Sequence, residues 1–270
     1  MPFDPNLRMI NWRAGGYFAY PQMAVTAKES AANPTLLWYA ALSRARDGDF
    51  DLMSDLVPVC ADDSNPILSK LSSELLGDAA PDSVIDSIVA RLQRNADNYE
   101  VVLEFCSVLH ARGMLADVRV LLDAFEGIVE IEDAEIITVY LSDCLEKEAG
   151  PLSDHRHFAT FSDYRRAVEQ RAQELSETFG TDRILLLAGE PFGVQRLARK
   201  MLGHLGEPDF PIFLRRRFEA STGIDCSSFY REREFQPLRA GALIETFLED
   251  PGNARFRDGQ RYFFGHPIPD

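Results

Sequence analysis

Apolar residues recur in this chain in two alternating patterns, and the copies of each pattern follow one another every 32 to 35 residues. The first pattern has offsets 0, 3, 4 and 7, in Met53/Leu56/Val57/Cys60, Ile85/Ile88/Val89/Leu92 and Val118/Leu121/Leu122/Phe125. The second has offsets 0, 3 and 7, in Leu68/Leu71/Leu75, Val102/Phe105/Leu109 and Ile137/Tyr140/Cys144. Such offsets place side chains on one stripe of an α-helix. Two stripes alternating at this period predict stacked helix pairs, an α-solenoid.

Proline and glycine mark the ends of the predicted helices. Asn-Pro pairs open two of them and glycines close several, because proline suits the first turn and glycine the turn after the last. The pattern predicts helices over 34–47, 50–61, 66–77, 82–94, 98–112, 115–126 and 133–148. Pro58 is expected to kink the second of these. Residues 34–150 resemble the HEAT-like class of helical repeats, while the signatures of leucine-rich and tetratricopeptide repeats are missing.

The regular period fades after Gly150-Pro151. Beyond this point we expect helices over 161–179, 194–205 and 237–249, and we assign no element to 206–236, which contains two prolines, Gly223 and three consecutive arginines. Residues 184–188 fit either a buried strand or a short helix. The apolar tail from Arg261 onward is expected to pack back onto the fold. The sequence-based division is therefore an N-terminal cap segment over 1–33, a helical-repeat region over 34–150, and a mostly helical C-terminal region over 151–270 with short strands and a packed-back tail.

Composition favours a folded, cytoplasmic protein. The hydrophobic share is 46%, which is ordinary for a globular chain. Its apolar runs are too short to span a bilayer, and the first residues have neither the basic nor the apolar stretch of a signal peptide. No two of the four cysteines form a C-x-x-C pair, so structural thiols are the better interpretation of Cys60, Cys106, Cys144 and Cys226.

The acidity of the chain is concentrated in its first part. Residues 1–150 contain 11 Lys and Arg against 25 Asp and Glu, a net charge of −14, whereas residues 151–270 contain 17 against 18, a net charge of −1. Nucleic acid would be repelled by such a surface, so we expect no nucleic-acid partner. A basic protein would be attracted. The alternative is that the acidity only keeps the protein soluble.

Three local sequences suggest chemistry, and each has a simpler interpretation. Asp154, His155 and His157 are metal-ligand types, but no third or fourth ligand type lies near them and a solvated loop is favoured. The segment 189–193 has the glycines of a phosphate loop without its lysine and hydroxyl, and its proline lacks a backbone donor. Cys226 with the two serines after it has neither a nucleophile elbow nor a placed histidine. We therefore predict no catalytic residues, no metal and no cofactor.

The three consecutive arginines, Arg215, Arg216 and Arg217, could form a small anion-binding patch. Glutamates follow closely in the sequence. A neutralised surface, or a clamp within the chain onto the acidic repeats, is the favoured interpretation.

Acidic residues of the repeats are the candidate partner-binding residues. In the second helix of each predicted pair, Glu74, Glu104 and Asp143 lie next to the buried stripe and not on it. The turns between helices add three further candidates: Asp97, Glu132 and Asp133. Helical stacks present such series along an extended surface, and that surface is where they bind partners. The alternative is an ordinary solvated face.

Two C-terminal segments, residues 218–226 (FEASTGIDC) and 262–266 (YFFGH), resemble the tails of bacterial HEAT-like proteins, some of which sit beside polymorphic toxins and look like immunity proteins. The resemblance implies an acidic cytoplasmic protein that neutralises a toxin domain by occluding it. It identifies no contact residues.

These observations together predict a non-enzymatic protein-binding module, an α-solenoid whose acidic face binds a basic protein such as a toxin or effector. Two alternatives stay open. One is an enzyme with a site in the C-terminal region, around His155, His157, Cys226 and His266. The other is a constitutive assembly scaffold.

Overall fold

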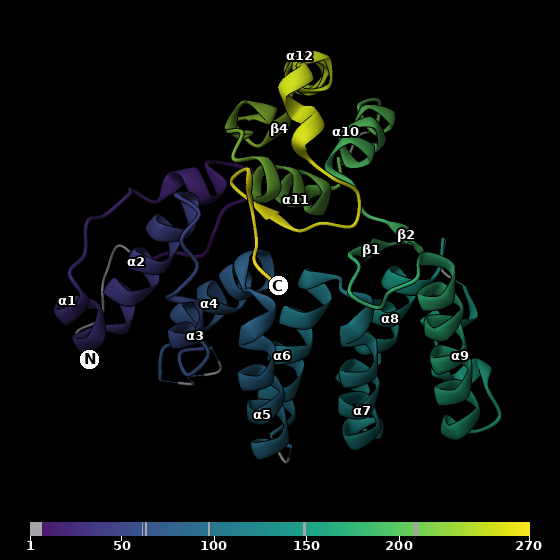
Figure 1. Cartoon of the computed structure of the whole chain (residues 1–270). Coiled ribbons are helices and arrows are strands. Elements are labelled where there is room, and N and C mark those ends of the chain that lie inside the picture. Colours follow the sequence, from purple (N-terminus) through teal and green to yellow (C-terminus); the bar gives the residue numbers. More distant parts are fainter. Residues whose placement is uncertain (1–6, 61, 63, 97, 148–149, 208–209) are drawn as a thin grey trace. The chain divides into compact units, whose positions relative to one another are not determined.

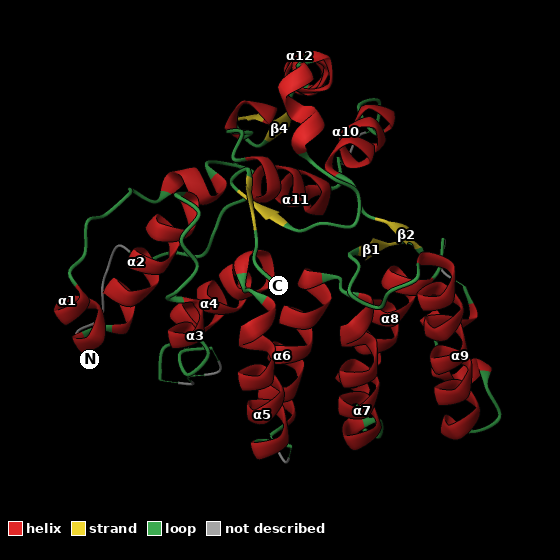
Figure 2. Ribbon diagram, viewed as in Figure 1, coloured by secondary structure: helices red, strands yellow, loops and turns green. Residues whose placement is uncertain are grey.

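The computed structural model describes residues 7–60, 62, 64–96, 98–147, 150–207 and 210–270. In these ranges the protein is mainly α-helical, with twelve α-helices and three antiparallel two-stranded hairpins (Figure 2). No helix in the described ranges is long and apolar enough to cross a membrane. Contacts divide the chain into two compact units. Unit 1 combines Met1–Pro81 with Gly193–Asp270, and unit 2 is Asp82–Phe192.

Unit 1 thus joins segments from both ends of the sequence, whereas the sequence-based division is linear, with boundaries after residues 33 and 150. The predicted repeat region 34–150 contributes helices to both units. The acidity also divides between them. Unit 2 has 22 Asp and Glu against 10 Lys and Arg, and unit 1 has 21 against 18. Unit 2 therefore carries most of the net negative charge.

Unit 2 contains two helix pairs and a fifth helix, which stand next to one another in Figure 1. The helices are α5 (Ile85–Arg94), α6 (Tyr99–Arg112), α7 (Val118–Ile128), α8 (Ile136–Leu145) and α9 (Phe161–Phe179). Helix α6 packs against α5, α7 and α8, and α9 packs against α7 and α8. Short 3-10 turns connect them: η2 (Asp82–Val84), η3 (Leu115–Asp117), η4 (Glu132–Glu135), η5 (Pro151–Ser153) and η6 (His155–His157).

Local capping fixes the ends of these helices. The side chain of Thr160 accepts a hydrogen bond from the backbone N–H of Asp163, so α9 begins where the sequence predicts. It ends before Gly180, whose φ of 71° is left-handed. Helix α7 continues through Gly127 to Ile128, so the prediction that this glycine ends the helix is wrong. Its φ is not left-handed, and glycine by itself does not force a stop.

A hairpin closes the C-terminal ends of α6 and α8. Its strands are β1 (Leu186–Leu187) and β2 (Glu190–Pro191), which confirms the strand alternative for part of 184–188. The N–H of Ala188 donates to the carbonyl of Asp143 at 2.7 Å, and that of Gly189 to Cys144 at 2.9 Å. The N–H of Leu186 donates to the carbonyl of Gly113 at 2.9 Å. The hairpin therefore pairs carbonyls that the helix ends leave without a partner.

Unit 1 contains the remaining elements. From its N-terminal segment come η1 (Gly16–Ala19), α1 (Ala27–Ala32), α2 (Pro34–Arg46), α3 (Met53–Leu56) and α4 (Pro66–Ala79). From its C-terminal segment come α10 (Val194–Gly203), α11 (Ile212–Thr222), η7 (Ser227–Phe229), β3 (Tyr230–Arg231), β4 (Glu234–Phe235), α12 (Pro237–Glu249), η8 (Pro251–Arg255), β5 (Tyr262–Phe263) and β6 (His266–Pro267). Helices α2, α10 and α12 lie close to their predicted bounds, and the tail packs back as predicted.

One prediction for unit 1 is wrong, and one of its helices was not predicted. The helix expected over 50–61 is only one regular turn, α3, followed by turns. Pro58 cannot donate a backbone hydrogen bond, so the helix does not extend past it. The stretch 206–236, to which the sequence analysis assigns no element, contains the three-turn helix α11.

Aromatic side chains of the N-terminal segment lie in the core of unit 1. Trp38 is fully buried, and its indole N–H donates to the carbonyl of Leu71 at 3.0 Å. Tyr17 is also fully buried, and its ring meets that of Phe263 edge-on at 5.5 Å. Its hydroxyl donates to Asp78 at 2.7 Å. Segments from both ends of the sequence therefore share one core.

The arginine run is part of this core. Arg215 and Glu219 are an ion pair at 3.0 Å with both side chains fully buried. Arg216 pairs with Asp78 of α4 at 3.1 Å and donates to the carbonyl of Glu74 at 3.2 Å. The prediction of a clamp within the chain is thus confirmed for Arg216. An exposed anion patch built from all three arginines is excluded, because Arg215 is inside.

Candidate functional site

The six candidate acidic residues do not lie on one surface. Glu74 is on α4 in unit 1, where it is half-buried beside Arg216, and burial raises the pKa of its carboxyl. Asp97 lies outside the described residues, and so does the side chain of Glu132 in η4. Asp133 is exposed in η4, immediately before α8. Only Glu104 and Asp143 belong to packed second helices of the same unit.

Glu104, Asp143 and Tyr140 lie on two packed helices of unit 2. Glu104 lies on α6 and Asp143 on α8, and these two helices pack against each other. Burial raises the pKa of Tyr140, and the charges of Glu104 and Asp143 raise it further. The negative charges of both carboxylates therefore disfavour ionisation of the same phenol.

A histidine completes this cluster. The ring of His110 stacks on that of Tyr140, with centroids 4.1 Å apart and planes within 9°. Its Nε2 lies 3.3 Å from a carboxylate oxygen of Asp143. The sequence gives His110 no acidic partner at a helical step. Asp143 follows it by 33 residues, however, which is one period of the repeat, so pairing residues one period apart is the signal that finds it.

Apolar side chains are exposed on the same two helices. Tyr99 at the start of α6 is 36% exposed, and Ile136 and Val139 on α8 are 41% and 40% exposed. The sequences of α6 and α8 contain a single arginine and no lysine. That arginine, Arg112, is buried and paired with Asp82 and Asp117. We call this surface the α6–α8 face, defined by Tyr99, Leu103, Glu104, Ser107, His110, Ile136, Val139, Tyr140 and Asp143.

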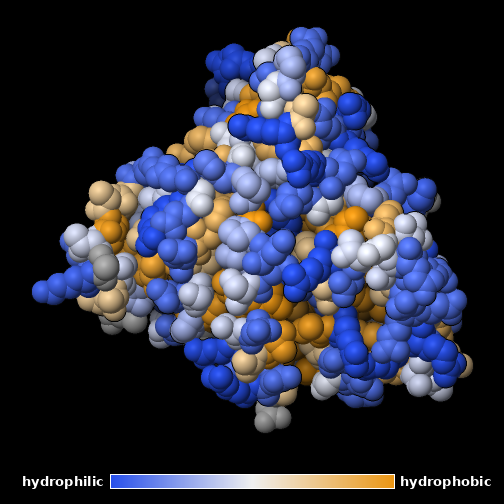
Figure 3. Space-filling view, viewed as in Figure 1, coloured by the Kyte–Doolittle hydropathy of each residue, from blue (hydrophilic) through white to orange (hydrophobic). Residues whose placement is uncertain are grey.

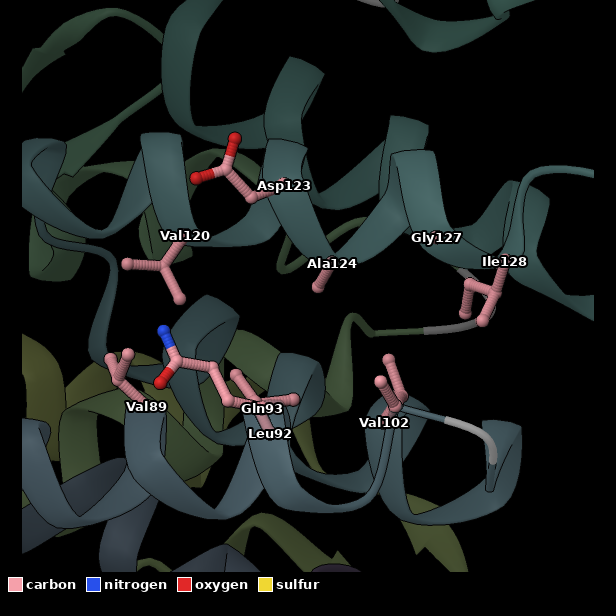
Figure 4. A pocket seen from close by; sticks show the side chains of 10 residues that line it. Val89, Leu92, Gln93, Val102, Val120, Asp123, Ala124, Gly127 and Ile128 are labelled. Atoms are coloured by element: carbon pink, nitrogen blue, oxygen red, sulfur yellow. The ribbon is translucent and has the colours of Figure 1, made fainter.

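A second feature of unit 2 is an apolar groove between α5 and α7, with a volume of about 200 Å³. In Figure 4, Val89 and Leu92 of α5 face Val120 and Ala124 of α7 across the opening. Its remaining labelled residues are Gln93, Val102, Asp123, Gly127 and Ile128. Hydrophobic residues gather between these two helices in the lower part of Figure 3. The sequence stripes predicted buried faces for α5 and α7, and they did not predict a groove.

Replacing Gly127 by alanine is expected to raise the free energy of unfolding by about 0.5–1 kcal/mol, because glycine within a helix loses more backbone entropy than alanine. A Cβ at this position would meet no atom within 4 Å. Urea unfolding followed by circular dichroism measures the change. Gly189→Ala is the matched control. That glycine has a φ of 68°, and a Cβ would lie 2.7 Å from the carbonyl oxygen of Leu145, so this variant should lose stability.

The local sequences that suggested chemistry form ion pairs and hydrogen bonds within the fold. Asp154 pairs with Arg156 at 2.9 Å, and the described residues contain no group of three or more His, Cys, Asp or Glu that could hold a metal ion. In the glycine-rich segment, the N–H of Gly189 donates to a helix carbonyl and that of Phe192 to Leu185. Neither donor is available to a phosphate.

The residues of the enzyme alternative are divided between the two units. His155 and His157 belong to unit 2, whereas Cys226 and His266 belong to unit 1. The Cys226 thiol is fully buried, and burial raises its pKa, so it is a weak nucleophile.

No protein family, curated protein or solved structure compared with the chain matches it significantly.

Proposed function

We propose that this protein is a non-enzymatic protein-binding module whose α6–α8 face binds a basic partner. The exposed carboxylate of Asp143 carries the proposal, because it lies on a helix that also exposes the apolar side chains of Ile136 and Val139. The sequences of α6 and α8 contain no lysine, and their one arginine, Arg112, is buried. Such a surface favours basic partners and speeds their association.

The architecture we propose for the binding region is a short HEAT-like α-solenoid. Support comes from the order of contacts in unit 2, where α6 and α8 pack together, as equivalent helices of neighbouring pairs do in stacked repeats. The partner we propose is a basic toxin or effector domain in the cytoplasm, which the protein neutralises by occlusion. This part rests on the resemblance of residues 218–226 and 262–266 to tails of HEAT-like immunity proteins.

Reversing the charge of the face is expected to weaken partner binding at least about tenfold, which corresponds to ~1.4 kcal/mol. The variant is Glu104→Lys combined with Asp143→Lys. The measurement is the affinity for the protein that co-purifies with the tagged chain from its source cells, at low and at high salt. Wild-type binding should weaken as salt is added, because exposed charges are screened.

The matched control is Glu245→Lys combined with Glu249→Lys. These two glutamates are exposed on α12 in unit 1, so the control makes the same change in net charge away from the face. It should bind as the wild type does. Equal losses in both variants, or binding that is unchanged at high salt, would contradict the proposal.

A further inference from the structure

The apolar groove between α5 and α7 has a buried floor and an exposed rim. Leu92, Val102 and Ile128 line it and are almost completely buried, so they form its floor. Gln93 and Gly127 line it as well and are exposed, so they belong to its rim. The groove is therefore a concave apolar site that opens to solvent on one side.

Small residues of α7 create this space. Val120, Ala124 and Gly127 are at offsets 0, 4 and 7, so they lie on one stripe of α7, and this stripe faces α5 in Figure 4. The side chains become smaller along the stripe, and a Cβ at Gly127 would meet no atom within 4 Å. A helix favours alanine over glycine, and neither the backbone nor a close contact requires glycine here. Such a departure from local propensity is typical of functional sites.

The lining of the groove is complementary to an uncharged ligand. Among the lining residues that the structure describes, only Asp123 is charged, and its carboxylate forms an ion pair with Arg165 of α9. Gln93 adds a neutral polar group, because its amide points from α5 toward α7 in Figure 4 and can both donate and accept hydrogen bonds. An ion would lose its hydration in this groove without gaining a counter-charge of its own.

The volume of the groove limits the size of the ligand. It is about 200 Å³. An apolar cavity of roughly 150 Å³ in another protein holds benzene, whereas sites for drug-sized ligands measure roughly 300–1,000 Å³. One aromatic ring with a short substituent lies between these limits.

We propose that the groove between α5 and α7 binds a small, uncharged, mainly apolar molecule, namely a single ring with one hydrogen-bonding substituent. The ring lies on Leu92, Val102 and Ile128, and the substituent bonds to the amide of Gln93. Binding is favourable because the apolar surfaces of the ring and of the groove are both removed from water. The inference goes beyond the proposed function, which concerns a partner protein on α6 and α8.

Three compounds test the site and the charge of its ligand. Benzyl alcohol, benzylamine and benzoate share one ring and are uncharged, cationic and anionic at neutral pH. Each is titrated into the full-length protein with isotope-labelled methyl groups, and binding is followed by NMR. Benzyl alcohol should shift the methyl signals of Val89, Leu92 and Val120 saturably and leave that of Leu71 in unit 1 unchanged. We expect it to bind at least about fivefold more tightly than either ion, since the ions lose more hydration.

Two results of this titration would overturn the proposal. The first is the absence of a saturable shift at the groove with benzyl alcohol. The second is benzylamine or benzoate binding there as tightly as benzyl alcohol, which would contradict an uncharged ligand. If the methyl groups of the groove respond to the co-purifying partner and not to benzyl alcohol, the groove is a protein contact, and the small-molecule proposal is likewise overturned.

Gly127→Leu distinguishes the loss of the space from the loss of the fold. Leucine on this stripe would fill the groove, and it is also the better helix former. The affinity for benzyl alcohol should therefore fall at least about tenfold, while the urea midpoint of unfolding should not fall. Gly203→Leu is the matched control. That glycine ends α10 in unit 1, is exposed, and a Cβ there would also meet no atom within 4 Å.

The control variant should bind benzyl alcohol as the wild type does. Equal losses in the two leucine variants, or an unchanged affinity in Gly127→Leu, would count against a ligand in this groove. If Gly127→Leu does not fold, Ala124→Leu enlarges a side chain on the same stripe of α7 and is judged by the same two measurements.

Discussion

Replacing Glu219 by alanine is expected to lower the free energy of unfolding by about 3–5 kcal/mol, because it leaves the buried charge of Arg215 without its partner. Both side chains of this pair are fully buried. The Glu219 carboxylate also accepts hydrogen bonds from the N–H groups of Tyr17, at 3.1 Å, and Cys226, at 3.3 Å. One side chain therefore connects the N-terminal segment, α11 and the turn after it.

Urea unfolding followed by far-UV circular dichroism measures this loss. Arg215→Met combined with Glu219→Leu is the informative second variant, because it removes both charges and keeps similar volumes. It should recover much of the stability that the single variant loses. Asp163→Ala, which breaks an exposed pair with Arg166, should cost less than about 1 kcal/mol. A Glu219→Ala protein as stable as the wild type would show that this pair does not anchor unit 1.

Replacing Arg112 by alanine is expected to destabilise unit 2 by about 3–5 kcal/mol for a related reason. Arg112 ends α6, is buried, and forms ion pairs with Asp82 and with Asp117 at 3.0 Å. Asp117 is itself buried, so the variant would leave a carboxylate without a counter-charge inside the protein. The pairs connect the start of the unit, the end of α6 and the turn before α7.

Hydrogen exchange measured by mass spectrometry can locate this effect. Amides of α6 and α7 should exchange faster in Arg112→Ala, since local opening becomes less costly when packing is lost. Arg112→Lys is the matched control. It keeps the charge but cannot bind both carboxylates with a planar fork, so we expect an intermediate loss. Exchange that accelerates only in α4 and α11 would contradict the assignment of these pairs to unit 2.

Helices with a regular apolar stripe were predictable from the sequence. The predicted ranges 161–179 and 237–249 are the bounds of α9 and α12, because capping and proline signals coincide there with the stripe. Helix α11 was missed for a physical reason. It buries the ion pair of Arg215 and Glu219 next to apolar residues such as Phe218, so its inward side is mixed and a regular apolar stripe is missing. The short α3 reflects the local effect of Pro58 overriding the stripe.

The candidate site was predictable only where the repeat period applies. Glu104 and Asp143 lie on the second helices of successive pairs, but Glu104 is two residues after the first apolar residue of its stripe and Asp143 is six residues after that of its own. Glu74 has the same stripe position as Asp143, six residues after the first apolar residue, yet it lies beside Arg216 from α11. That contact joins residues more than a hundred positions apart, and the local sequence pattern does not predict it. An acidic residue at a repeat position therefore lies on an exposed surface only where no distant segment of the chain packs over it.

The discontinuity of unit 1 has a consequence during synthesis. Arg261 donates to the carbonyls of Ala80 and Gly77, and β5 packs on α4, so the end of the N-terminal segment is closed by residues near the C-terminus. On the ribosome, residues 1–81 leave the exit tunnel before the partners that complete their core. Unit 2 is contiguous and can collapse first. The apolar side of residues 1–81 then stays uncovered until the C-terminal residues have been synthesised. We therefore expect chaperones to bind mainly to this segment.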